Sequence, residues 1–289
     1  MNGLPTEIER QINRYLPVTF EGLTFYPVTV EEYEVFMACA PALGFMQQSL
    51  PVAMLSIPLL TAFLHMEDAW AQANHDEDNG DPNAKIAGAL FSASVLALLL
   101  ALRLGHGEPM NERMSRARLV FDDRNGSKLK ALVLRGNAGE AIEITPAKFG
   151  RIRPLIAAQN GIEIQPLDEN PELVEADRAV RMANAPDLEV NLTDKVSFVC
   201  NVTGKDEEEV YNWPILKFNR RAASVERTLN FLVFGIGENS GMVKFKNGNP
   251  CPSPIFQRKH GSLGMIALDK FRRGAEQDIE NVSKSFDKE

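Results

Sequence analysis

The chain has 289 residues, of which 44% are apolar and 24% are charged, and these proportions are typical of a globular protein with a sizeable core. Its net charge of −8 argues against general nucleic-acid binding, because neutralising phosphates requires a surplus of Lys and Arg. The three cysteines, Cys39, Cys200 and Cys251, form neither a CxxC pair nor a zinc-type cluster, so we expect no disulfide framework. The lack of a disulfide framework favours the reducing cytoplasm, and residues 1–17 have no apolar core of a signal peptide.

The first predicted part, residues 1–75, begins with an amphipathic helix over 5–15. The β-rich stretch 20–28 around Gly22 then predicts a small hairpin. Thr29 is followed three residues later by Glu32, the spacing of a capping box, so a helix is expected to start there.

Apolar helices should continue from Val30 to about Trp70. Prolines cannot donate a backbone hydrogen bond, and three of them are expected to break this run into short helices: Pro41, Pro51 and Pro58. The second part, residues 76–83, is an acidic, turn-rich loop. It lacks the ligand spacing of an EF-hand, so we expect no metal there.

The third part, residues 84–166, opens with an apolar helix over 84–104. Residues 86–102 carry no charge, which leaves a membrane anchor as an alternative function. A spanning helix needs about 20 apolar residues, so a buried core helix is the favoured interpretation and a membrane location is not expected.

A change to alternating apolar residues follows, with strands predicted over 118–121 and 128–134. Asn125-Gly126 is the expected hairpin turn between them, and 140–144 adds a third strand.

Thr145-Pro146 then marks a helix start, with Thr as N-cap and Pro in the first turn. Asn160-Gly161 marks its end, and Pro154 should kink it. Its apolar face is formed by Phe149, Ile152 and Ile156.

The fourth part, residues 167–271, is predicted to be helical. Helices should start at Asn170, at Thr193 and after Asp206, with a linker over 184–190. The fifth part, residues 272–289, is a charged tail. Together these parts predict an α+β fold that is predominantly α-helical with a small antiparallel β-sheet.

No stretch has the pattern of an active site, so we expect a non-enzymatic protein without cofactors. Residues 235–241 have glycines at GxGxxxG spacing, one residue longer than a dinucleotide fingerprint, and a helical run precedes them. Ser262 lies between glycines, but the spacing of a nucleophile elbow is absent. The four histidines share no metal-binding spacing.

Charge is distributed unevenly along the chain. Residues 113–153 contain ten Lys or Arg and four Asp or Glu, so this segment carries +6 and the remainder −14. Two interpretations stay open: the basic segment faces an acidic partner, or it packs against the acidic remainder of its own chain, such as the C-terminal half.

Several stretches resemble proteins of bacteriophage tail modules, in the broad group of tail assembly chaperones. The resemblance extends over about 129–258 and is carried by packing and turn residues, namely Ile144–Arg153, Leu155–Gly161, Asn170–Leu173, Val202–Gly204, Tyr211–Trp213, Lys217–Arg221 and Gly241–Pro250. It implies a protein without catalytic residues that binds the tape-measure protein, shields its apolar helices and helps to recruit tail-tube proteins.

The resemblance also implies the host cytoplasm as location, with a place in the virion as a further possibility. A structural tail or baseplate component is the alternative within the same group. For a protein of this group, a protein-binding surface is predicted at Phe149, Ile152, Ile156, Trp213, Phe218, Phe231 and Phe234. Aromatic residues dominate interface energetics when they are exposed, and the alternative is that most of the aromatic ones here belong to the core.

Overall fold

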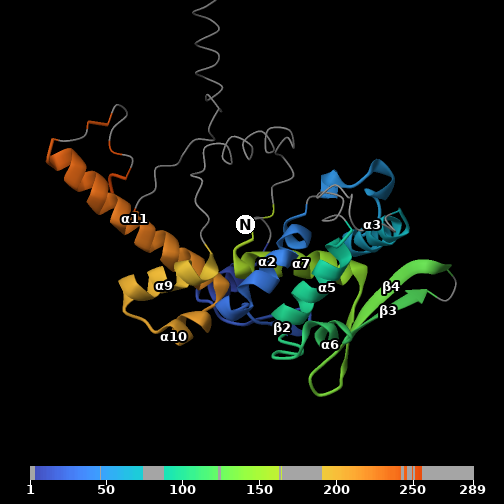
Figure 1. Ribbon diagram of the computed structural model, residues 1–289. Helices are drawn as coiled ribbons and strands as arrows, with labels where there is room; N and C mark the ends of the chain where they lie inside the picture. Colours follow the sequence, from blue (N-terminus) through green and yellow to red (C-terminus); the bar gives the residue numbers. More distant parts are fainter. Residues whose placement is uncertain are drawn as a thin grey trace, which may run out of the picture. The chain divides into compact units, whose positions relative to one another are not determined.

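The computed structural model describes residues 4–45, 47–73, 88–122, 125–162, 164, 191–241, 244–245, 249 and 251–255 (Figure 1). The predicted fold class is confirmed, since helices predominate and the strands form small antiparallel sheets. The acidic loop 76–83, the helix from Asn170, the linker 184–190 and the tail 272–289 lie outside the described residues.

The chain is divided into two compact units. The first contains Met1–Leu167 and Asn191–Val225, and the second contains Asp168–Val190 and Glu226–Glu289. The five-part division drawn from the sequence stays a prediction.

The N-terminal elements follow the sequence prediction. Helix α1 spans Thr6–Asn13, and strands β1 (Val18–Phe20) and β2 (Leu23–Phe25) form an antiparallel hairpin. Gly22 lies in its turn at φ +75°, a left-handed conformation that glycine adopts without steric cost.

The predicted capping box is wrong. A short 3-10 helix, η1 (Val30–Glu32), does begin after Thr29 and leads into α2 (Tyr33–Gly44), but the Thr29 side chain makes no cap hydrogen bond. The Glu32 carboxylate instead accepts a 2.6 Å hydrogen bond from Nη1 of Arg113. A hydrogen bond from a charged guanidinium is stronger than one from the neutral backbone N–H of a capping box.

The proline prediction is confirmed at two positions and wrong at the third. Pro51 precedes η3 (Val52–Met54), and Pro58 precedes α3 (Leu59–Ala73). Pro41 lies inside α2, where the helix continues to Gly44. Its missing N–H removes one hydrogen bond close to the end of the helix, which neighbouring packing tolerates.

Helix α5 (Leu90–Ala101) is the centre of the core, because nine of its twelve residues are buried. Glu67 of α3 holds its first turn by accepting hydrogen bonds from N–H and Oγ of Ser92, at 3.0 and 2.5 Å. Twelve residues rise about 18 Å, well short of a bilayer core of about 30 Å. Among the described residues no helix is both long and apolar enough to cross a membrane.

A three-stranded antiparallel sheet with the order β3-β4-β5 follows α6 (Met110–Met114). Its strands are β3 (Ala117–Asp122), β4 (Asn125–Arg135) and β5 (Ala141–Ile144). The predicted turn is displaced, because Asn125 and Gly126 belong to β4 and Asn125 pairs with Asp122.

Helix α7 (Pro146–Asn160) has the predicted ends. The Thr145 hydroxyl accepts a 3.2 Å hydrogen bond from the Lys148 N–H, and Gly161 ends the helix at φ +78°. Pro154 lies inside the helix, and the kink there stays a prediction.

Three helices complete the described chain: α9 (Leu192–Thr203), α10 (Glu207–Tyr211) and α11 (Ile215–Asn239). The α9 cap is Asn191, whose Oδ1 accepts from the Asp194 N–H at 2.7 Å, and the helix begins at Leu192, one residue before the predicted start at Thr193.

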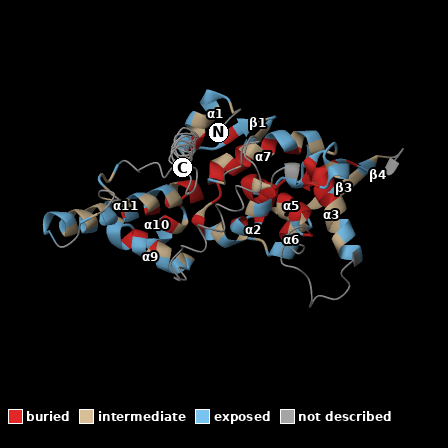
Figure 2. Ribbon diagram, turned by 90° about the horizontal axis from the view of Figure 1, so that it is seen from above, coloured by how far each residue is buried: buried red, intermediate tan, exposed pale blue. Residues whose placement is uncertain are grey.

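Among the residues that the structure describes, buried apolar side chains form two clusters, and Figure 2 colours the buried residues red. The larger contains buried residues of α2, α3, α5, α7 and the sheets. The smaller joins Val30 to α9, α10 and the start of α11. Backbone hydrogen bonds link these parts, from the Val30 N–H to the Trp213 carbonyl and from the Ile215 N–H to the Val28 carbonyl, both at 2.9 Å.

Candidate protein-binding surface

Most of the residues predicted to bind partners lie in the core. Phe149, Ile152, Ile156 and Phe218 are 0% exposed and Trp213 is 6% exposed. The face of α7 on which the first three lie packs into the larger cluster, so the prediction of a docking surface there is corrected. Apolar residues at helical spacing are covered in this case by the chain itself.

Trp213 and Phe218 also have polar and aromatic neighbours within their own unit. The ammonium group of Lys217 lies 4.1 Å from the centroid of the Trp213 ring, and burial lowers the pKa of this lysine. The Phe218 ring meets Tyr33 edge-on, with centroids 6.4 Å apart. Both aromatic side chains therefore make contacts that stabilise the fold.

Phe231 and Phe234, the last two predicted residues, are half-buried in the C-terminal half of α11. The Phe234 ring contacts Phe245 edge-on, at a centroid distance of 5.7 Å. Phe234 is therefore covered in part by the segment that follows the helix.

The C-terminal half of α11 presents an apolar row that the prediction missed. Leu229, Leu232, Val233 and Ile236 are 38%, 50%, 64% and 68% exposed. Their spacing of i, i+3, i+4 and i+7 places them on one side of a helix. We call these four residues the α11 stripe.

The opposite side of the same helix half is covered by the chain itself. Cys251 Sγ–H donates to the Arg227 carbonyl at 3.5 Å, and Asn249 Nδ2 donates to a Glu238 carboxylate oxygen at 2.8 Å. With Phe234, these two helix residues lie about 180° around the helix from the α11 stripe at 3.6 residues per turn. This part of α11 consequently carries the exposed stripe on one side and contacts the segment that follows the helix on the other.

A regular pattern in the sequence of α11 could have revealed the stripe. Buried Ile215, Phe218, Ala222 and Val225 are spaced as the a and d positions of heptads. The same spacing continues after Val225 through Leu229, Leu232 and Ile236. Residues at this spacing are buried up to Val225 and exposed from Leu229 onward, so the stripe begins where the heptad spacing continues without burial.

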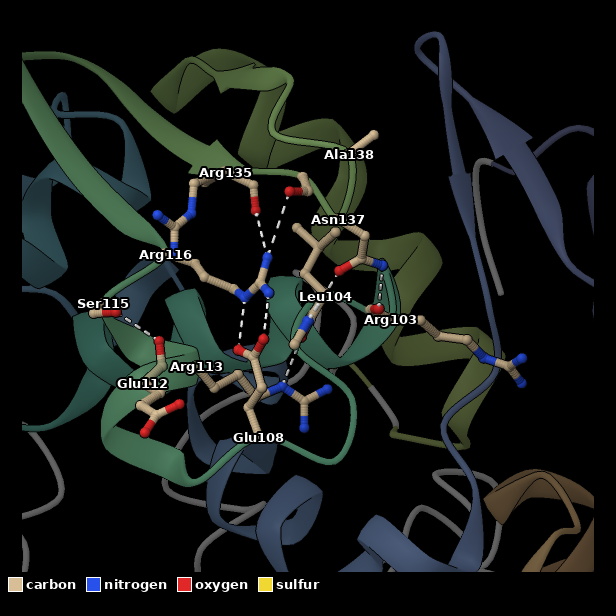
Figure 3. Close-up of polar contacts among 12 residues, drawn as sticks. Arg103, Leu104, Glu108, Glu112, Arg113, Ser115, Arg116, Arg135, Asn137 and Ala138 are labelled. Atoms are coloured by element: carbon tan, nitrogen blue, oxygen red, sulfur yellow. Dashed lines mark hydrogen bonds and ion pairs between the residues drawn. The ribbon is translucent and has the colours of Figure 1, made fainter.

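Two arginines of the basic segment form internal ion pairs, and Figure 3 shows the pair of Arg116 with Glu108 and the contact of Arg113 with Leu104. Nη1 of Arg113 pairs with Glu32, and its Nε donates to the Leu104 carbonyl at 2.8 Å. Arg116 pairs with the Glu108 carboxylate through two nitrogens, which lowers the pKa of Glu108 and raises that of Arg116.

Two further arginines of this segment also bind within the chain. Arg151 Nε donates to Glu21 at 2.6 Å, and Arg153 Nη1 donates to the carbonyls of Leu43 and Phe45 at 3.0 and 2.7 Å. Three of the ten basic residues thus pair with acidic residues of the same chain, and Arg153 binds backbone carbonyls. The acidic partners of these three arginines, Glu21, Glu32 and Glu108, all precede the basic segment.

The described nucleophilic and ligating side chains lie apart or are buried. Cys39 is 0% exposed, and burial raises the pKa of its thiol to about 12, so it behaves as an apolar core residue. Within the described ranges no three His, Cys, Asp or Glu side chains gather in a way that could hold a metal ion.

The α11 stripe has one evident chemical capacity, which is to remove the apolar side chains of a partner from water. An uncovered apolar row on a helix fits a second apolar helix, through packing of side-chain ridges into grooves. Comparisons with models of protein families, with curated proteins and with solved structures found no match to the chain.

Proposed function

We propose that the chain is a non-enzymatic, chaperone-like protein of bacteriophage tail assembly that binds apolar helices of a tape-measure protein. The observation that carries the proposal is the exposure of the α11 stripe on a helix whose opposite side contacts the segment that follows it. An apolar surface such as the α11 stripe can shield an apolar helix of the partner from water. The resemblance of residues 129–258 to tail-module proteins supplies the partner.

The size of the stripe sets the expected strength of a single contact. Covering four half-exposed aliphatic side chains stabilises a complex by roughly 3–6 kcal/mol. Association costs about 4–15 kcal/mol in lost freedom of motion, so one stripe holds one short helix weakly.

Several copies bound along one long helical partner would overcome this weakness through high effective concentration. A tape-measure protein is such a partner, because it offers many apolar helical turns in one chain. We therefore expect weak binding to an isolated helix and stable complexes with the long protein.

A pair of variants on the same helix tests this proposal. Leu232→Glu places a charge inside the α11 stripe, whereas Asn230→Glu adds the same charge at an exposed position beside it. Each variant is co-expressed with the tape-measure protein encoded in the same genome, and the soluble complex is measured by affinity purification and mass determination.

We expect the complex with the original chain and with Asn230→Glu, and its loss with Leu232→Glu. Equal recovery with both variants would reject the stripe as the binding surface. A genome without a tape-measure gene would reject the tail function. Finding the protein in purified phage particles would favour the alternative of a structural tail or baseplate component.

A further inference from the structure

Strand β3 forms one edge of the three-stranded sheet, since the strand order is β3-β4-β5. In Figure 1 the far end of the β3–β4 hairpin extends away from the helices of its unit. An edge strand carries backbone groups that can pair with an added strand.

The hydrogen bonds between β3 and β4 show which backbone groups of β3 point away from β4. In an antiparallel pair, residues alternate between directing both backbone groups toward the partner strand and directing them away. The Arg135 N–H donates to the Arg116 carbonyl at 2.8 Å, and Ala117 lies opposite Leu134. Arg118 therefore faces β4 with its backbone, whereas Ala117 and Leu119 direct N–H and C=O outward.

These outward groups have no hydrogen-bond partner among the described residues. β3 contains no proline, and its register stays regular until the bulge after Val120. Over Ala117–Val120 the edge therefore has neither a proline nor a bulge to block strand addition, and its exposed charge, Arg118, selects the partner strand.

The side chains on β3 specify the added strand. Ala117 and Leu119 pack against the larger core cluster, so residues opposite them should be apolar. Arg118 is exposed on the other face and makes no ion pair among the described residues. The residue opposite Arg118 would sit in a non-hydrogen-bonded pair, where side chains approach most closely, so an acidic residue fits there.

We propose that the outer edge of β3 binds an extended segment of a partner protein in which apolar and acidic residues alternate. A second copy of this chain fits poorly. Antiparallel pairing of two β3 strands about Leu119 would place Arg118 opposite Val120. It would also bring together two hairpins that each expose Arg118, Lys128, Lys130 and Arg135.

The test uses the full chain and a fluorescently labelled hexapeptide of alternating valine and glutamate, with a valine–lysine hexapeptide as control. Ala117→Pro removes an outward N–H without touching the ladder to β4, and Ala117→Ser keeps that N–H. We expect fluorescence anisotropy to show about tenfold weaker binding of the acidic peptide for Ala117→Pro, the loss of about one hydrogen bond, and no change for Ala117→Ser.

Arg118→Glu should reverse the preference, so that the lysine peptide binds better than the glutamate peptide. This exchange remains decisive if circular dichroism shows that Ala117→Pro does not fold. The proposal is overturned if the acidic peptide does not bind, or if a folded Ala117→Pro variant binds it unchanged. A concentration-dependent dimer in sedimentation that Ala117→Pro abolishes would assign the edge to a second copy instead.

Discussion

Oδ1 of Asn160 accepts a 2.8 Å hydrogen bond from the backbone N–H of Val28, 132 positions earlier in the chain. Both residues are buried, at 1% and 2% exposure. The neighbouring Gln159 donates from Nε2 to the Phe25 carbonyl at 3.2 Å. The last turn of α7 therefore fixes the backbone that follows the β1–β2 hairpin, where the chain turns toward η1.

Replacing Asn160 with Ala should lower the free energy of unfolding by about 1–3 kcal/mol, because the buried Val28 N–H loses its acceptor. Urea unfolding followed by circular dichroism measures the change. The control is Asn201→Ala on the exposed side of α9, which should stay within about 0.5 kcal/mol of the original chain. Equal midpoints for the two variants would show that the buried bond contributes nothing.

Replacing each of two glycines with Ala should change the stability of the fold in opposite directions. A Cβ on Gly88 would lie 2.4 Å from Cδ2 of the Trp70 ring, so Gly88→Ala should destabilise by about 1–3 kcal/mol through overpacking. Gly150 lies inside α7 with nothing within 4 Å of an added Cβ, so Gly150→Ala should stabilise by about 0.5–1 kcal/mol. Thermal unfolding of the two variants under one set of conditions compares them, and equal shifts would contradict the close approach of Trp70 to Gly88 and the open space at Gly150.

Helix α7 shows which features sequence reasoning can predict. The signals at Thr145, Pro146 and Gly161 act on backbone groups within a few positions of each residue. Local chemistry therefore determines where the helix begins and ends. The same holds for the turn at Gly22.

Contacts between distant residues explain what the sequence did not predict. Glu32 has the spacing of a capping box, but Arg113, 81 positions later, takes its carboxylate. Apolar periodicity locates the faces of α7 and α11 equally well, yet it does not tell which face the chain covers. Phe149 is consequently buried and Ile236 exposed, although both satisfy the same helical pattern.

The three cysteines should differ in their rates of alkylation. Cys39 is fully buried and has a thiol pKa of about 12, and burial also raises the pKa of Cys200. Only the thiolate reacts with iodoacetamide, so Cys251, which is half-buried, should be modified first at pH near 8. Peptide mass spectrometry over a time course identifies each site. Modification of Cys39 as fast as Cys251 in the folded protein would contradict this burial.

Acidification should weaken the ion pair between Glu108 and Arg116. The Arg116 hydrogen bond lowers the folded-state pKa of Glu108 from its ordinary value of 4.5. The pair therefore contributes its full stability above that value and loses it as the pH falls through the lowered pKa. Urea midpoints measured from about pH 7 down to about pH 3 should fall less steeply for Glu108→Gln than for the original chain, because the variant has no carboxylate to protonate.

Glu112→Gln, an exposed residue of the same region, serves as control and should keep the original pH profile. Identical profiles for Glu108→Gln and the original chain would show that this pair does not contribute to the acid sensitivity of the fold.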